Sequence, residues 1–99
     1  MRLIFEGHST VERGFDGVKF VGCCREPQDI DRYVPCRVTR EALELLQTFK
    51  LDESPQSLLN AYQAKSDIIN RIASAQFSGG VDRPVVTAQD VTQFARNAA

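Results

Sequence analysis

The chain has 99 residues, of which 42% are hydrophobic and 25% are charged. This length predicts a single domain over residues 1–99, and the apolar fraction excludes an intrinsically disordered chain, which has few apolar residues and a high net charge. No apolar run approaches the roughly 18 residues that a membrane-spanning helix needs, so we expect no membrane association.

The charges are balanced both in number and in position. Twelve basic and thirteen acidic residues give a net charge of -1, and residues 1–50 contain eight of each sign. Nonspecific nucleic-acid binding depends on clustered Lys and Arg, and the sequence contains no such cluster. The balance therefore disfavours a nucleic-acid partner, and it also disfavours binding to an anionic membrane surface.

Three cysteines, Cys23, Cys24 and Cys36, form an odd set without regular spacing. A small secreted domain more often contains four, six or eight cysteines. The first residues, Met1 to Glu6, reach a charged side chain after three apolar ones and so lack the core of a signal peptide. We therefore expect reduced thiols and a cytoplasmic location.

The first part of the chain predicts three strands. Arg2–Glu6 is a short apolar run, and the stretch His8–Gly17 after it is polar. Val18–Cys23 alternates in polarity, and so does Arg32–Val38 after a polar connection. Pro35 cannot donate to a sheet ladder, which favours an edge position or a bulge for the third strand.

Two helices are predicted in the middle of the chain. Thr39 is a good N-cap for the first helix, which has one apolar stripe. The residues of this stripe are Ala42, Leu45, Leu46 and Phe49. Ser54 followed by Pro55 is an N-cap with a first-position proline, and it begins a second, long helix that continues to about Phe77.

The C-terminal part predicts a short strand and a last helix. Gly79-Gly80 ends the long helix, and Arg83–Val86 follows as the strand. Thr87, with Asp90 three residues later, forms a capping box for a helix to about Asn97. This order predicts an α+β fold: a small antiparallel sheet of three to four strands, with two to three helices packed on one face.

Five stretches form a recognisable series in the chain: Leu3–Phe5, Gly17–Phe20, Val34–Leu43 with its Glu-Ala-Leu segment, Leu58–Tyr62 followed by Ile68-Ile69 and Ile72-Ala73, and Val85–Val91. In order and in apolar positions the series resembles domain-of-unknown-function family 1488, small bacterial proteins, over roughly residues 2–91. The resemblance implies an α+β fold and a cytoplasmic bacterial protein, and it implies no reaction. The sequence departs from the family pattern in two places: the connection Cys23–Asp31 is longer, and at Lys65-Ser66 the basic side chain comes one position early.

A metal site would have to combine Cys23, Cys24 and Cys36 with His8. Structural zinc sites usually pair ligands two to four residues apart. Adjacent cysteines followed by a gap of eleven residues fit this spacing poorly, so we predict no metal site and disfavour a disulfide or redox switch at Cys23-Cys24. Cys36 shares the parity of Val34 and is interpreted as a small core residue, and His8 as a solvated side chain.

Lys65 lies in the middle of the apolar arc of the predicted long helix, and Gln76 lies on the same line of the helical wheel. The interpretation that we favour is a lysine that extends its ammonium group past the edge of the core. The alternative is an arc wider than the sheet can cover, in which case Lys65 lies at a subunit or ligand interface.

The sequence contains no GxSxG, phosphate-binding glycine loop or HExxH motif, and we predict no catalytic residue and no cofactor. Small size, balanced charge and the wide apolar arc favour a non-enzymatic binding or interaction module. Its expected partner is a second copy in a homodimer or another protein. The alternative is a small cysteine-dependent redox or hydrolytic enzyme that uses Cys23 or Cys24.

Overall fold

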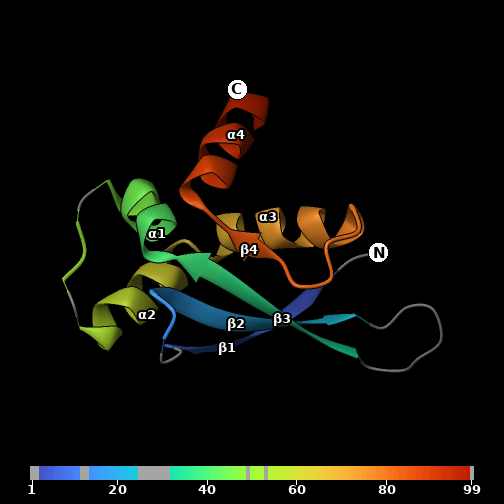
Figure 1. The fold of residues 1–99 in the computed structure, drawn as a ribbon, viewed down its shortest axis with the longest axis horizontal. Coiled ribbons are helices and arrows are strands. Elements are labelled where there is room, and N and C mark those ends of the chain that lie inside the picture. Colours follow the sequence, from blue (N-terminus) through green and yellow to red (C-terminus); the bar gives the residue numbers. More distant parts are fainter. Residues whose placement is uncertain (1–2, 12–13, 25–31, 49, 53, 99) are drawn as a thin grey trace.

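A computed structural model describes residues 3–11, 14–24, 32–48, 50–52 and 54–98. The elements follow in the order β1 (Ile4–Thr10), β2 (Gly17–Cys24), β3 (Arg32–Thr39), α1 (Arg40–Gln47), α2 (Pro55–Ala64), α3 (Ser66–Ser78), β4 (Val85–Val86) and α4 (Ala88–Ala98). They form one four-stranded sheet with helices packed against it (Figure 1). The predicted α+β class is confirmed, with four helices in the described residues where two to three were expected.

The sheet has the strand order β1-β2-β3-β4 and is mixed rather than wholly antiparallel. The first two pairs of strands are antiparallel, whereas β4 runs parallel to β3, with Arg37 beside Val85 and Val38 beside Val86. The connection explains this difference from the prediction. Three helices lie between β3 and β4 in the chain, and a parallel neighbour requires such a long crossover.

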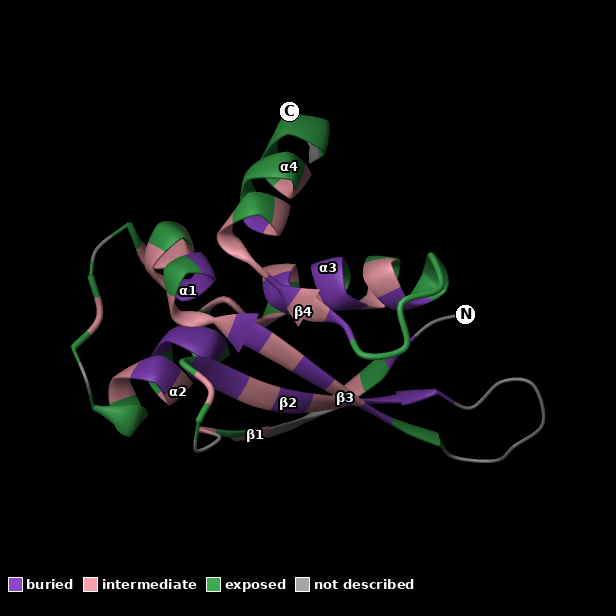
Figure 2. Ribbon diagram, in the orientation of Figure 1, coloured by how far each residue is buried: buried purple, intermediate pink, exposed green. Residues whose placement is uncertain are grey.

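The core lies on one face of this sheet. Val18 is opposite Val38 and Phe20 is opposite Cys36, and all four side chains are fully buried. The helices complete the core with Leu43, Leu58, Tyr62, Ile69, Ile72 and Phe77. On the opposite face Tyr33 of β3 is 66% exposed, so this side of the sheet reaches solvent there (Figure 2).

Strand β1 extends beyond the predicted first strand, Arg2–Glu6, into the polar stretch His8–Gly17. It pairs only with β2 and therefore forms one edge of the sheet. Its register shifts between Phe5 and Ser9, as at a β-bulge. Polar side chains do not prevent main-chain pairing at a sheet edge, so the polarity of this stretch did not indicate where the strand ends.

The predicted long helix is two helices, α2 and α3, which meet at Lys65. The φ and ψ angles of Lys65 are -120° and 18°, outside the α-helical region. Helix α2 packs against β1 and β2, whereas α3 packs against β4. Because the strands of a sheet are twisted relative to one another, a single straight helix does not follow both ends of the sheet.

All three predicted N-caps are confirmed. The side-chain oxygen of Thr39 accepts from the Ala42 N–H at 3.2 Å, and that of Ser54 accepts from the N–H of residue 56 at 3.2 Å. At the start of α4, the Thr87 N–H donates to Asp90 Oδ2 at 2.9 Å, and the Asp90 N–H donates to Thr87 Oγ1 at 3.3 Å. Each cap satisfies a main-chain donor that the first helical turn leaves unpaired.

The predicted edge position of Pro35 is only locally correct. Strand β3 lies inside the sheet, and Pro35 pairs with Val21 of β2. Strand β4, however, pairs only with Arg37 and Val38, so in the described sheet β3 has no second neighbour at Pro35. A proline is tolerated at such a position because the missing N–H removes no ladder hydrogen bond on that side.

Candidate functional site

The three cysteines do not form one site. Side chains alternate along a strand, so Cys24 lies on the core face and Cys23 on the opposite face. Cys36 pairs with Phe20, four residues before Cys24, which separates these two cysteines by roughly 13 Å along the strands. All three thiols are buried, and the described residues contain no group of three potential metal ligands. His8 belongs to β1, but its side chain lies outside the described part of the structure.

Cys36 is a poor candidate for a nucleophile. Burial raises the pKa of its thiol to about 11, and the backbone at Gly22 opposes this shift only in part. Its Sγ lies 3.5 Å from the carbonyl oxygen of Val34, to which the thiol donates. A protonated, buried thiol reacts slowly because the thiolate is the nucleophile. Cys36 therefore packs as a small core residue, as predicted.

Gln76, one of the two residues singled out on the long helix, bonds within the fold. Its side-chain amide contacts the main chain of Val85 and the carboxylate of Asp90. Lys65 is half-buried at the junction of α2 and α3. The apolar arc around it is largely covered, since Tyr62 and Ile69 on either side are buried. The interface role of Lys65 stays a prediction. Its argument was an apolar arc left uncovered by the sheet, and the buried side chains around Lys65 do not supply one.

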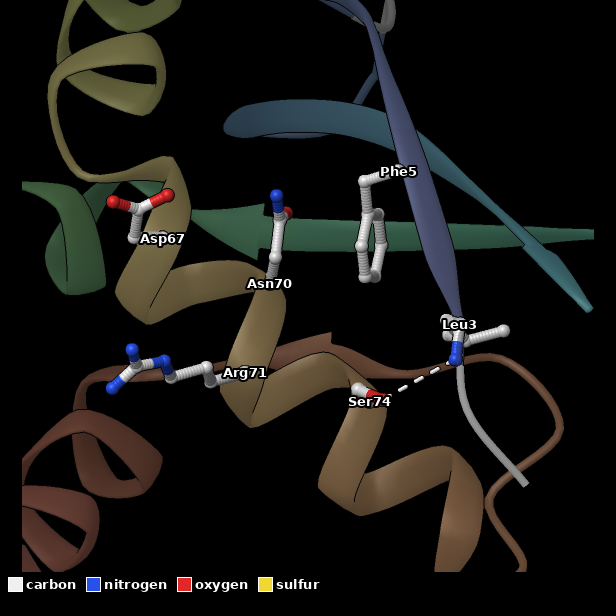
Figure 3. A pocket seen from close by; sticks show the side chains of 6 residues that line it. All are labelled: Leu3, Phe5, Asp67, Asn70, Arg71 and Ser74. Atoms are coloured by element: carbon white, nitrogen blue, oxygen red, sulfur yellow. Dashed lines mark hydrogen bonds between the residues drawn. The ribbon is translucent and has the colours of Figure 1, made fainter.

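A cleft of about 350 Å³ lies between β1 and α3 (Figure 3). Its lining residues are Leu3, Phe5, Asp67, Asn70, Arg71 and Ser74. Figure 3 shows Asn70 and Ser74 on the side of α3 that faces β1, whereas Arg71 extends away from that strand. The cleft thus has an apolar wall from Leu3 and Phe5, and a polar wall from the helix.

Two hydrogen bonds define the polar wall of this cleft. The Tyr62 hydroxyl donates to Asn70 Oδ1 at 2.9 Å, and the Leu3 N–H donates to Ser74 Oγ at 3.4 Å. Burial raises the pKa of Tyr62 to about 12, so its phenol stays protonated and remains a donor. Because Oδ1 of Asn70 is engaged, its Nδ2 group is the part left for a ligand, and it has no partner in the described residues.

An aromatic row holds this wall in place. The rings of Phe5 and Phe20 lie 5.8 Å apart, and those of Phe20 and Tyr62 stack at 4.9 Å. Buried aromatic pairs of this kind contribute beyond their area burial, and they fix both Phe5 and the hydroxyl that orients Asn70. The arrangement presents an apolar surface beside an oriented amide donor, which suits binding.

Sequence reasoning missed this cleft. On a wheel of the predicted long helix, Asn70 and Ser74 fall in the polar half, and nothing in that half distinguishes a solvent-facing residue from one that faces β1. The signal that was present is the apolar Leu3 and Phe5 at the start of the chain. Their position beside α3 depends on contacts between residues about 70 positions apart, such as that of Leu3 with Ser74.

No known protein family, curated protein or solved structure matches the chain. The resemblance to family 1488 therefore stays a prediction. None of the helices in the described part of the chain is both long and apolar enough to span a lipid bilayer.

Proposed function

We propose that the chain is a non-enzymatic interaction module that binds an extended segment of another protein in the cleft between β1 and α3. The observation that carries this proposal is the oriented amide of Asn70, which faces the apolar wall across the cleft. A peptide main chain offers a carbonyl acceptor at every residue, and its apolar side chains suit contact with Phe5. An edge strand beside a helix is an arrangement that extended peptides use.

The test uses short random peptides displayed on phage and selected against the purified chain. Binding of the enriched peptides is then measured on the Asn70→Leu variant and on a matched control, Asn60→Leu, an exposed asparagine of α2. We expect Asn70→Leu to weaken binding about tenfold or more, the effect of losing one hydrogen bond, and Asn60→Leu to leave it unchanged. Failure to enrich any peptide, or equal binding by both variants, contradicts the proposal.

The alternative, a cysteine-dependent enzyme, has less support. All three thiols are buried, and Cys36 lies in the core. The proposed location is the cytoplasm, where such cysteines stay reduced. A homodimer, which we also expected from the sequence, is compatible with the proposed role because the cleft uses α3 and β1 and leaves the outer faces of α1 and α4 uncovered.

A further inference from the structure

A second groove, of about 570 Å³, lies between α1 and α4. Its lining is mainly apolar and consists of Leu45, Leu46, Val91, Thr92, Ala95 and Arg96. Leu45 is 46% exposed, and Ala95 on the facing helix is exposed as well. A large side chain on one wall and a small one on the other make a surface on which a leucine from outside can pack against the alanine.

Helix α4 projects from the rest of the molecule, with the C-terminus at its tip (Figure 1). Beyond Val91 its side chains are exposed as far as Asn97, except for the half-buried Phe94 (Figure 2). The helix has 11 residues, a length at which an isolated helix is only marginally stable in water. The outer half of α4 is therefore the part of the fold that a partner would stabilise most.

The two ends of this surface carry opposite charges. Helices α1 and α4 lie side by side, and both run away from the sheet (Figure 1). Glu41 is in the first turn of α1, on the same face as Leu45, and Arg96 is in the last turn of α4. The acidic side chain thus lies at the sheet end of the surface and the basic one at the far end. Neither forms an ion pair within the described residues.

We infer that this surface, formed by Glu41, Leu45, Ala95 and Arg96, binds a second copy of the chain. A twofold axis in the plane of this face, at right angles to the diagonal line from Glu41 to Arg96, exchanges the two ends of that line, so Glu41 of each copy meets Arg96 of the other. Leu45 on α1 and Ala95 on α4 lie between these two ends, so the same operation brings each Leu45 toward α4 of the other copy, beside Ala95. A twofold interface must be complementary to itself, and a face with opposite charges at its two ends and a large apolar side chain facing a small one meets this condition.

Sedimentation equilibrium of the purified chain tests this inference. We expect a dimer that Arg96→Glu weakens about tenfold or more, because this change places Glu41 opposite a second carboxylate. The double variant Glu41→Arg, Arg96→Glu reverses both charges and should restore the dimer to within about threefold of the original affinity. The matched control is Arg83→Glu, which makes the same change in net charge at an exposed position away from α1 and α4.

Three outcomes overturn the inference: a monomer up to about 1 mM, a dimer that is insensitive to Arg96→Glu, or a double variant that does not restore association. The double variant carries both substitutions, so restored association also shows that the fold tolerates the two changes. The peptide-binding test at Asn70 uses a different surface, so its result does not affect the test of the dimer, and the reverse also holds.

Discussion

The side-chain amide of Gln76 on α3 pairs with the main chain of Val85 on β4 as a neighbouring strand would. The Val85 N–H donates to Gln76 Oε1 at 3.1 Å, and Gln76 Nε2 donates to the Val85 carbonyl at 3.2 Å. The same Nε2 donates to Asp90 Oδ2 at 3.0 Å, which ties α3 to the cap of α4. One side chain thus satisfies the outer main-chain groups of a two-residue strand that is too short to have a further neighbour.

Replacing Gln76 with alanine should destabilise the fold strongly. The Val85 N–H and carbonyl and the Asp90 carboxylate lose their partner, and each of these half-buried groups left unpaired costs part of the roughly 1–3 kcal/mol of a buried one. We therefore expect urea unfolding to show a loss of about 2–4 kcal/mol. Gln93→Ala, on the exposed face of α4, is the control and should stay within about 0.5 kcal/mol of the original chain. Equal effects of the two variants would show that the pairing contributes no stability.

Gly17 at the start of β2 should not tolerate a side chain. A Cβ atom at this position would overlap the carbonyl oxygen of Val38 and crowd the Phe15 ring. Since the obstacle is main chain of a paired strand, we expect Gly17→Ala to lower the free energy of unfolding by about 3 kcal/mol. Gly79→Ala is the matched control, because its Cβ meets nothing closer than 3.4 Å. Thermal unfolding measures both variants. Equal midpoints for Gly17→Ala and Gly79→Ala would show that the close approach of Val38 to Gly17 has no effect on stability.

Stability should fall in alkaline solution. The pKa values of Cys36 and Tyr62 are raised to about 11 and about 12, from ordinary values of 9.0 and 10.0. The unfolded chain therefore releases these protons first, so the free energy of unfolding decreases as pH rises from about 9 to 12. In urea titrations with a reductant, Cys36→Ala should flatten the part of the curve between about pH 9 and 11. An unchanged curve would show that the Cys36 thiol titrates normally.

The thiols should be protected from alkylation in the folded protein. Cys23, Cys24 and Cys36 are 5%, 1% and 0% exposed, so iodoacetamide reaches them mainly through unfolding. A short pulse followed by mass spectrometry should show little modification at neutral pH and full modification in denaturant. Rapid alkylation of Cys23 or Cys24 below pH 7 would instead indicate a thiolate of lowered pKa, and would favour the cysteine-dependent enzyme.

The candidate sites were less predictable than the fold. Cys36 was correctly interpreted as a core residue, because alternation along β3 reports burial directly. The role of Gln76 was missed, since its partners Val85 and Asp90 lie 9 and 14 positions away and the wheel shows only the direction of a side chain. Asn70 was missed for the same reason: on a helical wheel a residue that faces another strand looks like one that faces water.

The sequence by itself determined the local features of this protein. Thr39, Ser54 and Thr87 begin helices through hydrogen bonds to residues two or three positions away, and such contacts are encoded in short segments. Only the tertiary structure decided the bend at Lys65, the parallel alignment of β4, and the cleft beside Asn70. Each of these depends on how a helix must turn to follow a twisted sheet, or on which distant segments meet, and neither condition is present in the spacing of neighbouring residues.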